Sequence, residues 1–250
     1  MTLRIMQPIK ISLVKLGNLK FPISIPRIEA WRSRLFVVEH TAEIGALPNA
    51  AGADWTYTDE QLRTLIAKNS QSDFTVGLIN APIQHNFYLR RLENNVCILS
   101  LYETGEILHY SNIDIEQFIV RNLYELVALF LEHNQSIPES VYAMAHDETR
   151  SCLFDMCASK LDIVFSTSCP TLCEPCKARL LSAQLAKGFF TLLDSELRKI
   201  RKSLFFRIAD FVKAHPVYAI CITVLSGVAM NILANVIYDV WIKKLFGIGS

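Results

Sequence analysis

The alternation of apolar and polar residues predicts β-strands in the first hundred residues. Strand candidates cover residues 10–16, 34–39, 74–79 and 96–101. The first roughly alternates polar and apolar side chains, which is typical of a half-buried strand. The last two are nearly continuous apolar runs, and such runs suit interior strands that are covered on both faces.

Two segments of helical periodicity accompany these strands. Residues 58–67 begin with Thr58 or Asp59 as a cap and carry early acidic residues. Residues 113–133 carry Asp114 near their start and then a broad apolar stripe. This apolar run is too short to cross a bilayer, so we predict a core helix. The order of strands and helices predicts an α/β or α+β domain over residues 1–177.

A longer helical pattern fills residues 178–215, with basic residues between its apolar positions. We predict one basic amphipathic connecting helix. Two placements remain open at this point: it lies along an anionic membrane surface, or it packs on the domain with a solvated polar face.

The segment that follows is the most apolar part of the chain. Val217 to Tyr238 is 22 residues long and contains no charged residue, and a helix of this length spans about 33 Å, which matches the apolar layer of a bilayer. Tyr218, Tyr238 and Trp241 lie near its ends, as interfacial aromatic residues do. We predict a transmembrane helix over 216–242 and a short tail, 243–250; the alternative is a buried C-terminal helix of a globular protein.

The flanks of this segment predict its orientation. Many basic residues precede it, whereas Lys243 and Lys244 follow it. Basic residues stay on the cytoplasmic side, so we predict a single-pass, tail-anchored protein of the inner (cytoplasmic) membrane with a cytoplasmic N-terminal domain. Gly227, Asn231 and Asn235 share one helix face, and small and polar residues on a lipid-embedded face predict a homo-oligomer.

Composition narrows the class of partner. The formal net charge is +1 and 51% of the residues are hydrophobic, so bulk electrostatics give no strong nucleic-acid signal. The chain has no glycine-rich phosphate loop, and its basic residues cluster beside the apolar segment, where they suit lipid headgroups. The seven cysteines, an odd number without an evident export signal, favour a reducing compartment.

Metal-binding chemistry is concentrated in residues 146–176. This stretch holds five of the seven cysteines and ends in Cys173-Glu174-Pro175-Cys176. A C-x-x-C turn points two thiolates at one tetrahedral centre, and an upstream pair completes the shell. That pair is either His146 with Cys152, or Cys152 with Cys157 as the alternative ligand.

We favour His146, Cys152, Cys173 and Cys176, because Cys157 and Cys169 are explained as small apolar residues. A closed shell of four protein ligands predicts structural Zn²⁺, since a catalytic zinc keeps a position open for water. In the competing interpretation these cysteines are buried residues beside a lone C-x-x-C loop.

With these residues in place, the middle of the chain, about residues 70–180, resembles the archaemetzincins, zinc metallopeptidases of the zincin class. Their HExxHxxGxxH helix is followed by a cysteine run and a distant C-x-x-C that bind a structural zinc. His146 stands at the last histidine of the motif, Asp147 at the first cysteine, Cys152 at the second and Phe154 at a methionine. The resemblance implies a zincin-like α+β domain that keeps the structural zinc site.

The resemblance departs at the catalytic motif. The HExxH positions read Ser136-Ile-Pro-Glu-Ser140, Ala143 replaces the glycine, and Pro138 disfavours a helix there. In the family His146 would serve the catalytic zinc, so its assignment to the structural site is an inference from the missing cysteine at Asp147. We predict a pseudo-metallopeptidase in which HExxH is lost. Glu125 is the remaining carboxylate candidate for a general base, and we favour a helix-surface or paired carboxylate at this position.

These observations predict a membrane-anchored, zinc-stabilised sensor or interaction protein with a protein partner. Its architecture resembles oligomerising membrane effectors of bacterial defence or toxin systems, an analogy at the level of architecture. The alternative is a membrane-anchored metallopeptidase or other hydrolase with a non-standard site. That site would draw on His85, His109, Glu125, His133, Asp147 or Asp155.

Overall fold

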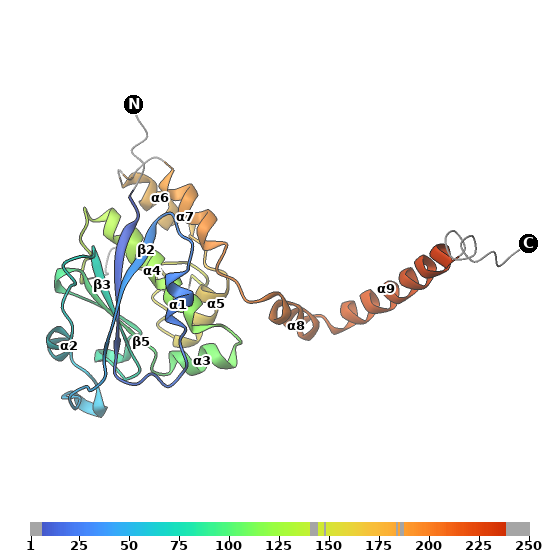
Figure 1. The fold of residues 1–250 in the computed structure, drawn as a ribbon. Helices are drawn as coiled ribbons and strands as arrows, with labels where there is room; N and C mark the ends of the chain where they lie inside the picture. Colours follow the sequence, from blue (N-terminus) through green and yellow to red (C-terminus); the bar gives the residue numbers. More distant parts are fainter. Residues whose placement is uncertain (1–6, 141–144, 148, 184, 186–187, 239–250) are drawn as a thin grey trace, which may run out of the picture. The chain divides into compact units, whose positions relative to one another are not determined.

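A five-stranded mixed sheet forms the centre of the first of the two units into which the chain divides, residues 1–201 and 202–250. The computed structural model describes residues 7–140, 145–147, 149–183, 185 and 188–238 (Figure 1). The positions of Ala143, of Trp241 and the end of the predicted span, and of the tail 243–250 lie outside these residues.

The strands are β1 (Ile9–Leu16), β2 (Phe36–Ile44), β3 (Phe74–Ile79), β4 (Leu89–Leu92) and β5 (Val96–Ser100), in the order β2-β1-β3-β5-β4. All neighbours are parallel except β4 and β5, which are antiparallel. The four strands predicted from the pattern are present, and β3 and β5 are interior and fully buried, as their apolar runs indicate.

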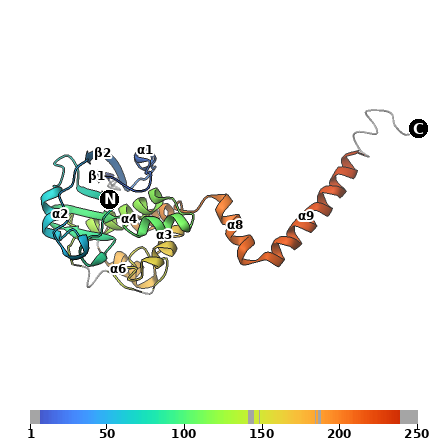
Figure 2. The same ribbon diagram turned by 90° about the horizontal axis from the view of Figure 1, so that it is seen from below.

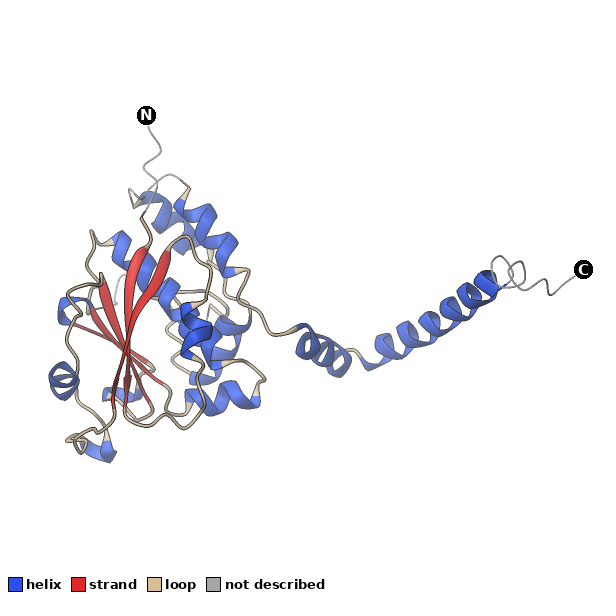
Figure 3. Cartoon of the chain, viewed as in Figure 1, coloured by secondary structure: helices blue, strands red, loops and turns tan. Residues whose placement is uncertain are grey.

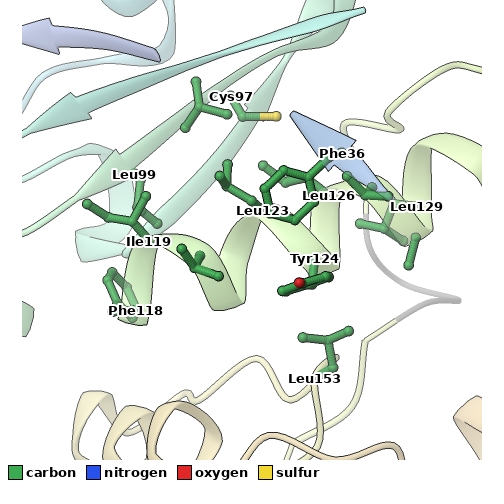
Figure 4. Packing of buried hydrophobic residues seen from close by; sticks show 14 of the residues in the cluster. Phe36, Cys97, Leu99, Phe118, Ile119, Leu123, Tyr124, Leu126, Leu129 and Leu153 are labelled. Atoms are coloured by element: carbon green, nitrogen blue, oxygen red, sulfur yellow. The ribbon is translucent and has the colours of Figure 1, made fainter. Parts of the chain in front are cut away.

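One face of the sheet packs against helix α4 (Ile115–Glu132). This helix is apolar on nearly every side, and helices of that kind lie inside a core. Figure 4 shows Ile119 and Leu123 of α4 on the side of the helix that faces Leu99 and Cys97 of β5, with Leu153 on the opposite side. The core helix predicted over residues 113–133 is thus confirmed.

Further helices surround α4 on the same face of the sheet, and their buried residues belong to the same core. They are α1 (Ile25–Glu29), α3 (Thr104–Tyr110), α5 (Ile163–Ser168), α6 (Glu174–Ser182) and α7 (Phe189–Leu197) (Figure 3). The opposite face is covered by α2 (Asp59–Leu65), whose Thr58 and Gln61 form the capping box expected there. Short 3₁₀ turns occur at Ala53–Trp55, Gln84–Asn86, Glu93–Asn95 and Lys160–Asp162.

Two features differ from the sequence predictions. The segment around residues 82–92 contains the edge strand β4, whose four residues, LRRL, are too few for a clear alternation. The predicted continuous helix 178–215 is wrong. Its residues belong to α6, α7 and α8 (Leu204–Ala214). Helix α7 begins after Gly188, whose φ of 89° lies in the left-handed region, and a residue in that conformation interrupts a right-handed helix.

The second unit contains α8 and α9 (Pro216–Ile237) (Figure 2). Among the described residues, α9 is the one helix long and apolar enough to span a bilayer, with 22 residues and a mean hydropathy of 2.1. Its side chains are exposed, whereas the core helix of a soluble domain is mostly buried.

Candidate metal centre

The loop that carries His146 and Cys152 is held by backbone hydrogen bonds. The Met156 amide donates to the His146 carbonyl over 2.8 Å, and the His146 amide donates to the Phe154 carbonyl. The Leu153 amide reaches the Thr171 carbonyl, and Thr171 returns a bond to the Ser151 carbonyl, both over 2.8 Å. These bonds place Cys152 beside the segment that leads into Cys173.

The second pair of thiols stands at the start of α6. Cys173 is the N-terminal cap residue, in an extended conformation, and Pro175 occupies the first turn, where its missing N–H costs nothing. Cys176 follows inside the same turn and is buried. The C-x-x-C spacing therefore folds as a helix start that turns both thiols to one side.

The four side chains predicted as ligands come together. The Nε2 atom of His146 lies 3.2 Å from the Cys152 Sγ atom and 3.3 Å from the Sγ atoms of Cys173 and Cys176. All four donor atoms lie within 4.8 Å of one another. His146 and Cys173 are half-buried, and Cys152 and Cys176 are buried.

This Cys3His cluster fits a zinc ion. Around a tetrahedral zinc, with bonds of about 2.3 Å to sulfur and about 2.0 Å to nitrogen, neighbouring N and S donors are about 3.5 Å apart. The observed separations of 3.2 to 3.3 Å are close to that value. Three soft thiolates and an imidazole are also the donor set that selects zinc.

The thiols of the cluster influence one another. A hydrogen bond from the Cys176 thiol lowers the pKa of Cys152 to about 4, and that bond in turn raises the pKa of Cys176. Zinc binds cysteine as the thiolate, so metal binding at this cluster would release the protons that its thiols still hold.

Two buried polar atoms beside the cluster lack a hydrogen-bond partner among the described residues: the Nδ1 atom of His146 and the Oδ2 atom of Asp155. Their residues are paired in a short parallel bridge. Burial raises the pKa of Asp155, and the charge of His146 opposes that rise. A zinc-ligating histidine usually donates its second ring N–H to such a carboxylate.

Two cation contacts tie the metal segment to α4. The Arg121 guanidinium donates to the carbonyl of Leu153, the neighbour of Cys152, and Arg121 is fully buried. The Nε atom of Arg179, in α6, lies 2.9 Å from the Oε1 atom of Glu132. The Cζ atom of the same guanidinium lies over the Phe154 ring, 4.3 Å from its centre. The loop that carries Cys152 and the helix α6 that carries Cys176 both contact α4, and the four ligands of the cluster link this loop to α6.

The carboxylate of Glu125, the candidate for a general base, forms an ion pair. Its Oε2 atom lies 2.5 Å from Nη1 of Arg121, one helical turn away on α4, and both side chains are buried. Burial raises the pKa of Glu125, and Arg121 acts against this rise. The carboxylate faces an ion-pair partner from its own helix.

The other predicted residues are not members of the Cys3His cluster. The Cys157 thiol, the alternative ligand, contacts the Asp155 carbonyl and the Ser166 hydroxyl, and burial raises its pKa to about 11. Asp147 accepts a bond from the Ala158 amide. In the part of the chain that the structure describes, the Cys3His set is the one metal-capable cluster, and it does not include His85, His109 or His133.

The sequence patterns gave no indication of Arg121, Glu132 or Arg179 as residues that support the site. The one available signal was indirect: an arginine within an otherwise apolar core helix requires a buried partner.

Comparisons with known proteins give a distant structural likeness. The chain is similar to the crystal structure of archaemetzincin from Archaeoglobus fulgidus, complexed with malonate, with 12% identity and a TM-score of 0.41. It is also similar to a zinc-dependent peptidase from Methanocorpusculum labreanum, with 12% identity and a TM-score of 0.37. Each match covers 68% of this chain and 99% of the other. No protein-family model and no curated protein matches the chain.

Proposed function

We propose that this chain is a membrane-anchored interaction protein whose N-terminal α/β unit is stabilised by structural zinc and has no peptidase activity. In this proposal His146, Cys152, Cys173 and Cys176 are the zinc ligands. The unit acts by binding a ligand or a protein partner, and α9 holds it at the cytoplasmic membrane.

The composition of the cluster carries this proposal. Four protein donor atoms lie within 4.8 Å of one another, enough to complete a tetrahedral shell. A catalytic zinc has three protein ligands and keeps the fourth position for water or substrate. A zinc held by all four side chains has no such position, so its role is to hold the loop and α6 together.

The state of Glu125 also supports a role without hydrolysis. A general base must accept a proton from water at the reacting centre. The Glu125 carboxylate instead forms a buried ion pair with Arg121, which also donates to the Asn122 side chain over 2.9 Å. These contacts are those of a core ion pair.

Anchoring by α9 rests on its length, its mean hydropathy of 2.1 and its exposed apolar surface. The basic residues that precede it, Arg201, Lys202, Arg207 and Lys213, favour a cytoplasmic N-terminal unit. Within α9 the Asn235 side chain donates to Asn231 over 3.2 Å, which leaves further amide groups to be satisfied by a second copy. We therefore include homo-oligomerisation in the proposal, and a role in bacterial defence stays a prediction by analogy.

Hydrolysis assays with the full chain in detergent distinguish the proposal from the peptidase alternative. We expect no zinc-dependent cleavage of unstructured protein substrates by the wild-type protein, and likewise none by Glu125→Gln. Cleavage that a chelator abolishes, and that Glu125→Gln lowers while zinc content is unchanged, would overturn the proposal and establish the metallopeptidase.

A further inference from the structure

Helix α8 exposes a continuous apolar face. Its large apolar side chains at Leu204, Phe205, Ile208, Phe211 and Val212 recur at helical spacing, so they share one side of the helix. These side chains are between 44% and 74% exposed. Such a face in an 11-residue helix needs a surface to cover it.

The rest of the basic segment does not share this property. Leu180 of α6 and Leu193 and Leu197 of α7 are buried in the core of the first unit. The sequence pattern left two placements open for residues 178–215, and the structure divides the segment between them. Its first part is buried in the core of the first unit, and α8 belongs to the second unit, in which its apolar face is exposed.

Positive charge lies on the other sides of α8. Arg207 and Lys213 are exposed and make no ion pair with any residue that the structure describes. The one acidic residue of the helix, Asp210, pairs with Lys202 over 2.9 Å. The helix therefore combines an apolar face with uncompensated basic side chains, the combination that binds anionic membrane surfaces.

The connection to α9 limits how far α8 can lie from a bilayer. Only His215 separates α8 from the first residue of α9, Pro216. The rings of Phe211 and His215 are 5.3 Å apart, and those of His215 and Tyr218 are 6.0 Å apart, so aromatic rings bridge the junction. A helix of 11 residues is about 16 Å long. If α9 spans the membrane, all of α8 therefore lies within about 16 Å of the membrane end of α9, close to the headgroup layer.

We propose that α8 lies in the interfacial layer of a bilayer that contains anionic lipid, with its apolar face among the acyl chains and Arg207 and Lys213 at the phosphates. This inference rests on the proposed anchoring by α9. It adds, next to the span, a helix whose contact with the membrane depends on the charge of the lipid headgroups.

Fluorescence with brominated lipids tests the placement. The full chain carrying Ile208→Trp is reconstituted in nanodiscs of phosphatidylcholine with phosphatidylglycerol, with and without bromine on the acyl chains. Asp210→Trp is the matched control, because it adds the same side chain on the polar side of α8 and leaves Arg207 and Lys213 in place. The emission of the three native tryptophans is measured in the unmodified chain and subtracted, and zinc content verifies that both variants are folded.

We expect the added emission of Ile208→Trp to shift to the blue and to be quenched by brominated lipid, and that of Asp210→Trp to be affected much less. Omitting phosphatidylglycerol, or adding Arg207→Gln and Lys213→Gln, should reduce the quenching of Ile208→Trp. A blue shift without quenching would place the face against protein and overturn the inference. Equal quenching of both variants, or quenching independent of lipid charge, would also overturn it.

The same samples separate this inference from the anchor on which it rests. A chain that co-purifies with nanodiscs but shows no quenching of Ile208→Trp retains the anchor and loses the interfacial helix. A chain that does not enter nanodiscs at all overturns the anchoring by α9 and the present inference with it.

Discussion

At the scale of single residues, the zinc ligands show which chemistry can be read directly from a sequence. The C-x-x-C spacing fixes two thiols on one helix turn, so local geometry alone brings Cys173 and Cys176 together. His146 and Cys152 were found because they lie in the same short segment. The contacts of Arg121 and Arg179 depend on how α4 packs on that segment, and this tertiary information has no local pattern.

Asp155 is expected to orient His146 once zinc is bound, because its free Oδ2 atom and the Nδ1 atom of His146 are both buried without partners among the described residues. Loss of such a supporting carboxylate typically lowers metal affinity about 10–100-fold. We predict a decrease of that size for Asp155→Asn, measured by competition with a chromogenic chelator.

Asp147→Asn is the control for this measurement, because Asp147 is exposed and its carboxylate accepts a bond from the Ala158 amide. It should bind zinc as wild type does. Equal affinities for Asp155→Asn and wild type would show that Asp155 does not support His146.

The buried pair Arg121–Glu125 gives a second prediction at this scale. Removal of one partner of a buried ion pair leaves an uncompensated charge and costs about 3–5 kcal/mol, whereas an apolar replacement of both is often neutral. We predict that Arg121→Met lowers the free energy of unfolding by about that amount. The double variant Arg121→Met/Glu125→Leu should recover much of the loss in denaturant titrations. A double variant as unstable as the single one would show that the bond from Arg121 to the Leu153 carbonyl, and not the charge of Glu125, dominates.

At the scale of elements, periodicity predicted the most apolar elements and missed β4 and the breaks between α6, α7 and α8. The residues of β3, β5 and α4 are apolar enough for the pattern to give their type and position. β4 has four residues, two of them arginine, and its strand conformation comes from pairing with β5. The breaks between α6, α7 and α8 preserve the spacing of apolar residues, so the pattern could not reveal them.

Helix α9 carries the prediction about assembly. Asn231 and Asn235 are in contact on one face, and unsatisfied amides favour helix association in lipid. We predict that Asn231→Leu/Asn235→Leu shifts the detergent-solubilised protein to a smaller mass in light scattering. Ser226→Leu is the control, because Ser226 lies on another side of the helix and bonds to the Ile222 carbonyl of its own chain. An unchanged mass for the asparagine variant would exclude this face as the oligomer interface.

At the scale of the whole molecule, we propose that a zinc-stabilised unit is joined to a membrane span, with the bulk of the chain in the cytoplasm. Cys169 offers a test of this orientation, since it is exposed on the first unit and lies outside the metal cluster. We predict that a membrane-impermeant maleimide labels Cys169 in inverted vesicles and not in intact cells. Cys169→Ser gives the background signal, and labelling in intact cells would reverse the orientation.

The metal content of the purified full chain tests the central claim most directly. Elemental analysis should find one zinc ion per chain, in keeping with one Cys3His cluster. It should find none in Cys173→Ser/Cys176→Ser, which should also melt at a lower temperature, while Cys169→Ser keeps its zinc. A folded wild-type protein without zinc would contradict the account, and two zinc ions per chain would contradict a purely structural role for the metal.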